Sequence, residues 1–460
     1  MSFLSFSARR DLREQVWRAW VSRGEQPGAT DNRAIVAELL ALRQQQAELL
    51  GYACYADYAL ADTMAGSRAA VQALLDQVWE PAKDAAAREA AEIEAQMQGC
   101  GHALQAWDWR YYAEQVRQTR YAVNAAELKA YFPLDAMVEA LFDCADRLFG
   151  LRFELLPEAP SYHPDVKVYQ VSDADGSPRG LFLHDNFART GKRSGAWMNA
   201  LRWQSRGMEG PGSHSLPIIL NTNNFAKPAV GQPALLSFDE ARTLFHEFGH
   251  GLHGLLSEVE FERLSGTQVL RDFVELPSQI FEHWLSVPEV LKRHARHWQS
   301  GEPISDEMLA RLKAAERFNQ GYDTVRYCAS ALVDLAAHGV HPTSITDISA
   351  FELEAMKAAG LPEAIGLNHR LCHFQHLFSG SSYAAGYYVY LWAEVLDCDA
   401  YEAFAALGDP FDPALAEKLR SCILSVGNSR EPGQAFRDFR GRDPRVEPML
   451  RERGLLPEPI

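Results

Sequence analysis

The chain has 460 residues, of which 47% are apolar, and a formal net charge of −16. This length and composition are those of a globular protein with one large core or two to three domains. The acidic balance argues against a nucleic-acid partner, because binding a phosphate backbone requires clustered Lys and Arg.

Membrane and export signals are not evident in the sequence. No apolar run reaches 18 residues, so no membrane span is predicted. The first residues, MSFLSFSARRDLREQVW, do not follow the pattern of a signal peptide. The seven cysteines are odd in number and contain no CxxC pair, which favours free thiols in a reducing compartment. We therefore expect a cytoplasmic protein.

Residues 8–153 are predicted to form one helix after another. The stretch DNRAIVAELLALRQQQAELLGYACYADYAL has apolar residues at 3.6-residue spacing, and Gly51 is a plausible stop between two helices. The stretch RAAVQALLDQVWEPAKDAAAREAAEIEAQMQ is similar, and its Ala, Glu and Gln content favours helix. We expect a helical part over residues 1–160, followed by a part over 161–460 that holds a small sheet and further helices.

The pattern changes to short strands between about residues 165 and 225. VKVYQVSD, GLFLHDNFA and SLPIILNTNNF are rich in β-branched or aromatic residues and are bounded by Gly, Pro, Asp and Asn. They predict a small, mostly antiparallel sheet in which DADGSPRG is a turn. TGKRSGAWMNA is expected to carry an edge strand, where Gly195 allows another backbone to approach closely.

Helices return after Ser237, where SFDE has the form of a capping box between Ser237 and Glu240. Further helices are predicted at 272–290, 305–338, 346–358, 384–406 and 412–424. The predicted fold class is therefore mainly α, with a small sheet beside the helix that follows Ser237.

That helix contains the pattern HExxH in ARTLFHEFGHGLHGLL. Residues four apart lie on one helix face, so His246 and His250 can direct their imidazoles at one ion. Glu247 lies roughly 100° round the helix axis, beside the ion, where it can accept a proton from water. The alternative is that these are ordinary polar residues of a helix, but a buried Glu–His cluster without a partner would be costly. The motif therefore favours a zinc site.

A catalytic zinc ion usually has three protein ligands and one water. The continuation HExxHxxGxxH of the metzincins is excluded, because His253 and Leu256 stand where Gly and the third His are required. His253 is expected to pack near the site or contact a ligand. Three carboxylates follow the helix too closely to turn back toward it: Glu258, Glu260 and Glu262. The better third ligand is Glu275 in SGTQVLRDFVELPSQIFEHW. Glu282 lies seven residues later, where it can hydrogen-bond a ligand imidazole.

Several separated motifs now resemble one family. FDEARTLFHEFGHGLHGLLS, LSGTQVLRDFVELPSQIFEHW and SGSSYAAGYYVYLWAEVLD occur in the order found in the thimet-oligopeptidase-like zinc peptidases. DNFARTGKRSGAWM, FNQGYDTVRY and FRGRDPRVEPMLRERGLL also fit, so the resemblance covers nearly the whole chain. Within the family the chain is most similar to the bacterial peptidyl-dipeptidases, and next to the oligopeptidase A branch.

The resemblance implies a mainly helical peptidase that holds one zinc ion per chain through His246, His250 and Glu275. Glu247 would be the general base. Tyr390 matches the tyrosine that stabilises the tetrahedral oxyanion, and His376 and Tyr383 match groups that contact and orient the substrate. The roles of Tyr387 and Tyr388 stay open.

Short peptides are the implied substrates. An edge strand at Gly195 and Ala196 would bind the peptide backbone by strand addition. Removal of C-terminal dipeptides also requires an anchor for a carboxylate, for which Arg370 is one candidate, although a surface role is as good an explanation.

Two departures from the family leave the activity open. Family members usually carry about two hundred further residues before the point where this chain begins, and these form one wall of the channel. Their absence suggests self-association or a partner chain that covers the exposed surface. The glycine-rich turn before the tyrosine is replaced by SGSSY, in which Ser381 and Ser382 should stiffen or reposition the loop. The alternatives are an oligopeptidase-A-like endopeptidase, or a catalytically weak zinc- or peptide-binding remnant.

Overall fold

The computed structural model describes residues 2–121, 125–207 and 214–456. Helices dominate, as predicted. The chain forms two compact units, each built from segments far apart in sequence. Unit 1 contains Met1–Ala122, Ala314–Trp392 and Met449–Ile460, and unit 2 contains Val123–Lys313 and Ala393–Pro448. The division of the chain after residue 160 stays a prediction.

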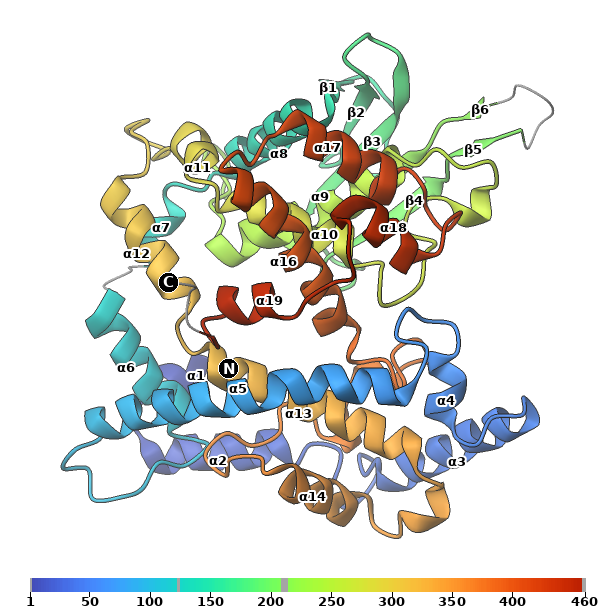
Figure 1. Cartoon of the computed structure of the whole chain (residues 1–460). Coiled ribbons are helices and arrows are strands. Elements are labelled where there is room, and N and C mark those ends of the chain that lie inside the picture. The colour runs from blue at the N-terminus through green and yellow to red at the C-terminus, as the bar shows by residue number, and fades with distance from the viewer. Residues whose placement is uncertain (1, 122–124, 208–213, 457–460) are drawn as a thin grey trace. The chain divides into compact units, whose positions relative to one another are not determined.

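Unit 1 is helical. Its helices are α1 (Ser2–Phe6), α2 (Arg10–Val21), α3 (Arg33–Leu49), α4 (Tyr55–Leu60), α5 (Arg68–Gln96), α6 (Trp109–Tyr121), α13 (Gln320–Gly339), α14 (Ile348–Ala359) and α15 (Gln375–Phe378), with the turns η2 (Pro342–Ser344) and η3 (Leu371–His373). The long helices α5 and α13 lie side by side (Figure 1). A Cβ atom at Gly321 of α13 would lie 2.3 Å from the backbone nitrogen of Ala86 on α5, so glycine permits this close approach.

Unit 2 contains the sheet and the helix with the HExxH motif. Its helices are α7 (Ala125–Lys129), α8 (Leu134–Phe149), α9 (Phe238–Leu255), α10 (Leu276–Leu285), α11 (Pro288–His294), α17 (Pro413–Leu419) and α18 (Pro432–Arg440), with the 3-10 turn η1 (Glu262–Leu264) and the π-helical turn η4 (Arg420–Leu424). Three helices, α12 (Asp306–Glu316), α16 (Val389–Leu407) and α19 (Glu447–Glu452), contain residues of both units.

The five-stranded sheet has the order β1-β2-β3-β7-β4. Its strands are β1 (Arg152–Leu155), β2 (Lys167–Ser172), β3 (Pro178–Phe187), β4 (Trp197–Arg202) and β7 (Ile218–Phe225), and a separate pair joins β5 (Ser205–Arg206) and β6 (His214–Ser215). Every pairing in the five-stranded sheet is antiparallel except that of β3 with β7, so the prediction of a mostly antiparallel sheet is confirmed. β4 forms the edge, also as predicted.

Helix α9 lies against this sheet. A Cβ atom at Gly251 would lie 3.3 Å from Oδ1 of Asn221, and one at Gly254 would lie 2.5 Å from Cδ1 of Ile219. Asn221 and Ile219 both belong to β7, so the two glycines bring the helix close to the central strands. The sheet thus supports the helix that carries the motif.

Several predicted helix boundaries are wrong, each for a local reason. The expected helix at 272–290 is split into α10 and α11, the second beginning at Pro288. The one at 305–338 is split into α12 and α13, because Asn319 adopts a positive φ of 63°. The helix predicted at 384–406 begins only at Val389, after Ala385 with φ 56°.

The run of helices predicted over residues 8–153 ends slightly earlier than expected. Gly150, with φ 69°, ends α8, and the strand β1 follows it. The helices expected at 346–358 and 412–424 correspond to α14 and to α17 with η4.

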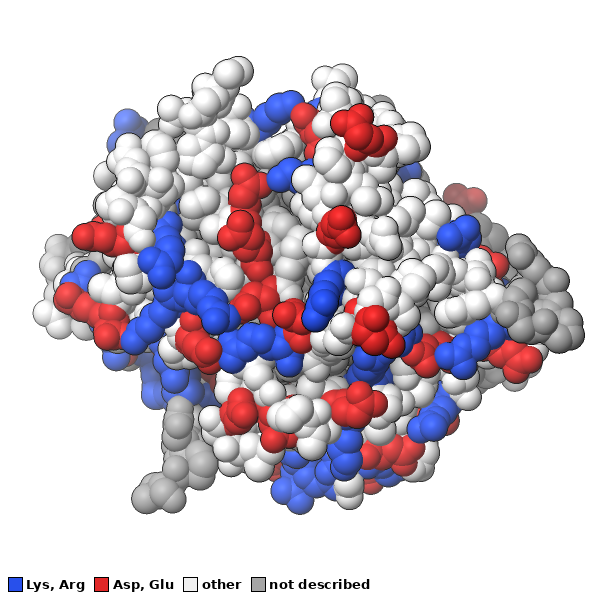
Figure 2. Space-filling model, turned by 90° about the horizontal axis from the view of Figure 1, so that it is seen from above, with Lys and Arg blue, Asp and Glu red and all other residues white. Residues whose placement is uncertain are grey.

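Much of the acidic surface is paired with basic side chains. Figure 2 shows one face of the molecule, on which Lys and Arg lie next to Asp and Glu. Arg120 and Glu92 form one exposed pair at 2.9 Å, and Arg293 and Asp143 form another at 2.8 Å. Such exposed pairs stabilise a fold little. Among the described residues, no helix is both long and apolar enough to cross a membrane.

Candidate metal centre

The start of α9 is fixed by its cap. The Oγ atom of Ser237 accepts a hydrogen bond from the backbone N–H of Glu240 at 3.1 Å, and Oε2 of Glu240 accepts one from the N–H of Ser237 at 2.6 Å. This confirms the predicted capping box. It begins the helix at Phe238 and puts His246 and His250 on one face, one turn apart.

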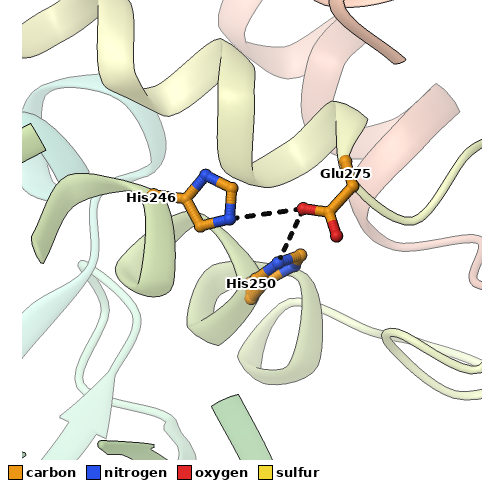
Figure 3. A group of neighbouring side chains, drawn as sticks. All are labelled: His246, His250 and Glu275. Carbon is orange, nitrogen blue, oxygen red and sulfur yellow. Dashed lines mark ion pairs between the residues drawn. The ribbon is translucent and has the colours of Figure 1, made fainter. Parts of the chain in front are cut away.

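Three side chains meet at that face (Figure 3). The Nε2 atoms of His246 and His250 each lie 3.2 Å from the same oxygen, Oε2 of Glu275. One possible ligand atom of each residue lies within 4.8 Å of the others. The structure therefore brings together the three residues that the sequence predicted as metal ligands.

This donor set fits zinc. A tetrahedral zinc ion with bonds of about 2.0–2.1 Å separates its donor atoms by about 3.3 Å, close to the spacing of the two imidazoles from the carboxylate. Two imidazoles and one carboxylate are also the ligand types of catalytic zinc sites, in which a fourth position is left for water or substrate.

Glu275 is held at the start of α10. It is the residue before the first turn, which contains Pro277, and it is 8% exposed. The Oγ atom of Ser278 donates to the backbone carbonyl of Glu275 at 2.8 Å and lies 3.1 Å from its Oε2. The hydrogen bonds of the two imidazoles keep the pKa of Glu275 far below its ordinary value, although burial acts in the opposite direction.

Gly249 brings α9 and α10 together, and the sequence reasoning missed it. A Cβ atom there would lie 2.4 Å from the carbonyl oxygen of Pro277 and 2.7 Å from Cα of Ser278. A glycine inside a capped, apolar helix is unfavourable for helix formation, so it was a usable signal of a close helix contact.

Glu282 occupies the position expected for a partner of a ligand. Its Oε1 lies 2.7 Å from Nδ1 of His246, on the opposite side of the ring from the nitrogen that faces Glu275. The two carboxylates raise the pKa of His246 well above its ordinary value, although burial acts in the opposite direction. Such a bond fixes the ring orientation and the tautomer of a ligand imidazole.

Glu247 and His253 are both buried on α9. Glu247 is 5% exposed, its Oε2 has no hydrogen-bond partner among the described residues, and burial raises its pKa. Its role as general base stays a prediction. His253 is fully buried, and neither ring nitrogen has a described partner. Burial lowers the pKa of His253 to about 3, which favours the packing role over contact with a ligand.

The predicted substrate-contacting His and Tyr residues gather in unit 1. The rings of His376 and Tyr383 lie 5.7 Å apart, and Tyr383 stacks on Tyr390 at 5.7 Å. The ring of Tyr387, whose role the sequence left open, lies 5.4 Å from His376. The four side chains form one aromatic group, and their roles toward a substrate stay predictions.

Gly195 and Ala196 directly precede the edge strand β4. Gly195 has φ 96°, and its carbonyl accepts a hydrogen bond from Nδ2 of Asn224 at 2.6 Å. This bond fixes the turn that leads into the edge strand.

Arg370 is engaged by other side chains. Its guanidinium pairs with Glu25 at 2.6 Å and with Glu352, and Nη1 also donates to the carbonyl of Val21. These contacts favour a structural role. Its role as a carboxylate anchor stays a prediction, and it would require the guanidinium to leave two carboxylates.

The chain matches one peptidase family and several curated relatives. Residues 3–455 match the model of Peptidase family M3. The chain is 41% identical over 451 residues to the dipeptidyl carboxypeptidase of Salmonella typhimurium, covering 97% of this chain and 65% of that protein. It is 35% identical over 460 residues to oligopeptidase A of Escherichia coli, covering 98% and 67%. The chain thus spans about two thirds of the length of these relatives.

The fold is also similar to that of a solved structure. The M32 carboxypeptidase from Deinococcus radiodurans superimposes with a TM-score of 0.53 at 14% identity, covering 96% of this chain and 77% of that chain. At this identity the likeness concerns the fold alone. The family match over nearly the whole chain, together with the His246–His250–Glu275 cluster on α9 and at the start of α10, shows that the chain belongs to Peptidase family M3.

Proposed function

We propose that the protein is a zinc metallopeptidase that hydrolyses short peptides and releases C-terminal dipeptides. The observation that carries the proposal is the convergence of His246 Nε2 and His250 Nε2 on Oε2 of Glu275, with the buried carboxyl of Glu247 on the same helix. The similarity to a dipeptidyl carboxypeptidase supports the choice of dipeptide release.

Each residue of the metal centre is proposed to have its own role in peptide hydrolysis. A zinc ion held by the three ligands would polarise the scissile carbonyl and lower the pKa of water to about 7. Glu247 accepts the proton of the attacking water and then delivers it to the leaving amine. Glu282 holds the imidazole of His246 in place through its 2.7 Å contact with Nδ1.

The aromatic group of unit 1 is proposed to act on the substrate. The phenol of Tyr390 donates to the developing oxyanion, and His376 and Tyr383 orient the peptide. Their mutual ring contacts support a common role, because each side chain limits the rotamers of its neighbours.

The edge strand β4 is proposed to bind the peptide backbone. β4 pairs with β7 on one side, and it contacts α9, so a peptide added to its other side would run beside the motif helix. Strand addition at Gly195 and Ala196 gives affinity from main-chain hydrogen bonds with little side-chain selectivity.

Dipeptide release is tested with matched peptides that differ only at the C-terminus. We expect cleavage two residues from a free carboxylate, and loss of cleavage when that carboxylate is amidated. Equal cleavage of both peptides would refute dipeptide release and favour the alternative, an endopeptidase similar to oligopeptidase A. A protein that binds zinc and cleaves neither peptide would be a zinc- or peptide-binding remnant.

A partner chain or self-association is proposed to cover part of unit 1. Ile35, Leu42 and Leu49 follow one another at seven-residue spacing along α3, and their exposed fractions are 54%, 52% and 88%. Seven-residue spacing aligns side chains in a stripe suited to a second helix. Light scattering after size exclusion is expected to give a mass above 51.5 kDa, or a defined complex with a partner. A monomer that stays soluble without a partner would contradict this.

We also propose a reducing, cytoplasmic location. None of the seven cysteines, all of which lie in the described part of the chain, is in a disulfide, and Cys54, Cys144, Cys328, Cys372 and Cys398 are buried. Labelling of thiols in the denatured protein, taken directly from cells without reductant, should detect all seven.

A further inference from the structure

The segment between α15 and α16 carries two of the four side chains of the aromatic group but has little regular structure. His376 belongs to the short helix α15, and Tyr383 and Tyr387 lie between Ser379 and the start of α16 at Val389. Ser381 and Ser382 are exposed. We call residues 377–387 the tyrosine loop. A loop of this kind holds its side chains in place only if other elements bind its backbone.

Arg43 binds the first part of the tyrosine loop. It lies on α3 and is 7% exposed. Its Nη2 donates to the carbonyl of Leu377 and, at 2.9 Å, to that of Gly380. Its Nη1 lies 2.9 Å from Nε2 of His338, on α13. One guanidinium therefore connects the loop to two helices.

His338 in turn contacts Asp334. A guanidinium can only donate, so Nε2 of His338 must accept, and the ring is neutral with its proton on Nδ1. Nδ1 lies 2.9 Å from Oδ1 of Asp334, one turn earlier on α13, and 3.0 Å from its backbone carbonyl. Both His338 and Asp334 are almost fully buried, at 2% and 1% exposure.

Asp334 binds the last part of the tyrosine loop. Its Oδ1 accepts from the backbone N–H of Ala385 at 2.8 Å, and its Oδ2 accepts from that of Tyr387 at 2.9 Å. Ala385 has φ 56°, a left-handed conformation that a residue with a Cβ atom avoids unless its surroundings impose it. The Asp334 carboxylate is the group that holds this turn.

We propose that Arg43, His338 and Asp334 form a brace that positions the tyrosine loop for catalysis. The proposal rests on the proposed peptidase function, since it assigns the brace to the presentation of Tyr383, and of His376 directly before the loop, to substrate. Burying the charged Arg43 and Asp334 with a histidine between them is a costly way to gain stability, because packed apolar residues often do as well. What the triad provides is attachment at both ends of the loop, through four backbone groups.

The test compares Arg43→Met with Arg13→Met. Arg13 is a matched control, because it is a 1% exposed arginine of unit 1 that binds Asp108 and the carbonyls of Trp107 and Ser7, none of them in the loop. Hydrogen exchange of the amides of 377–388, zinc content and steady-state kinetics are measured on both variants of the full chain.

We expect Arg43→Met to speed exchange in the loop about tenfold or more and to lower kcat about tenfold, with KM changed by less than about threefold. Zinc content should stay at the wild-type level, because the ligands lie in unit 2. Arg13→Met should lower the melting temperature but change neither loop exchange nor kcat. Arg43→Lys, which keeps the charge but loses the forked donors, should fall between Arg43→Met and wild type.

Asp334→Asn is the second variant, in case Arg43→Met does not fold. It keeps the side-chain volume but turns an amide NH2 toward a backbone N–H, so fast exchange should be confined to the end of the loop near Ala385. The proposal is overturned if the loop amides of the brace variants exchange no faster than those of Arg13→Met, whatever the activity. It is also overturned if these amides exchange faster but kcat is unchanged. Absence of cleavage by the wild-type protein would instead be a failure of the proposed peptidase function.

Discussion

Replacing Gly249 by alanine should separate α9 from α10 and weaken zinc binding. The added Cβ atom would lie 2.4 Å from the carbonyl oxygen of Pro277, whereas ordinary contacts begin at 3.4 Å. The helices must therefore move apart by about 1 Å, since both nearest atoms, in Pro277 and Ser278, belong to the backbone. Glu275 lies at the start of α10 and would move with it.

The expected loss of zinc affinity follows from how little the ligand positions of a zinc site can vary. Metal–ligand distances in working sites vary by only about 0.2 Å, so a displacement of about 1 Å at Glu275 is large. We expect zinc affinity to fall about 10- to 100-fold, as when a supporting contact of a ligand is lost. Overpacking should cost about 1–3 kcal/mol of stability, partly offset by about 0.5–1 kcal/mol from the better helix propensity of alanine.

Gly251→Ala is the matched control on the same helix. Its Cβ atom would lie 3.3 Å from Asn221, so the fit requires a shift of only about 0.1 Å. Zinc affinity is measured by competition with a chromophoric chelator, and stability by urea unfolding of the zinc-free proteins. The reasoning is refuted if Gly249→Ala binds zinc as tightly as wild type, or if Gly251→Ala loses as much affinity.

Three further predictions concern Glu282, Tyr390 and His184. Glu282→Ala removes the partner of His246 Nδ1, and zinc affinity should fall about 10- to 100-fold by the same chelator competition; unchanged affinity would mean that the contact does not support the ligand. Tyr390→Phe should lower kcat about 10²- to 10³-fold at unchanged zinc content, whereas a rise in KM alone would contradict the oxyanion role. Burial lowers the pKa of His184 to about 3, so below about pH 6.5 the unfolded chain takes up a proton that the folded chain does not, and stability falls as the pH drops. His184→Leu should therefore reduce the loss of stability between pH 7.5 and 5 by about 2 kcal/mol, as measured by urea unfolding of the zinc-free protein. The same dependence of stability on pH in the variant and the wild type would refute this.

The sequence predicted the features that depend on local pattern. The cap at Ser237, the shared helix face of His246 and His250, and the edge position of β4 all follow from spacing and residue type. Placing Glu275 required more than spacing, since other carboxylates stood nearby in the chain. Its apolar surroundings made it the better choice, and the geometry now agrees.

The remaining features depend on contacts between distant segments. The interruption at Ala385 cannot be read from an aromatic, helix-like stretch, because it is imposed by Asp334 more than fifty residues earlier. The parallel pairing of β3 with β7 likewise depends on how the chain returns past β4. The stiffening or repositioning of the SGSSY loop by Ser381 and Ser382 stays a prediction. Among the described residues positive φ at a non-glycine occurs only at Asn319 and Ala385, so neither serine has a left-handed backbone.

The central claim is that Glu247 is the proton acceptor of a peptidase built on the cluster of His246, His250 and Glu275. It is tested most directly by measuring peptide turnover and zinc content on the same preparations of wild type and Glu247→Gln. The account predicts one zinc ion per chain in both proteins, with cleavage in the wild type and a loss of at least about 10³-fold in the variant. Cleavage by Glu247→Gln at the wild-type rate would contradict it.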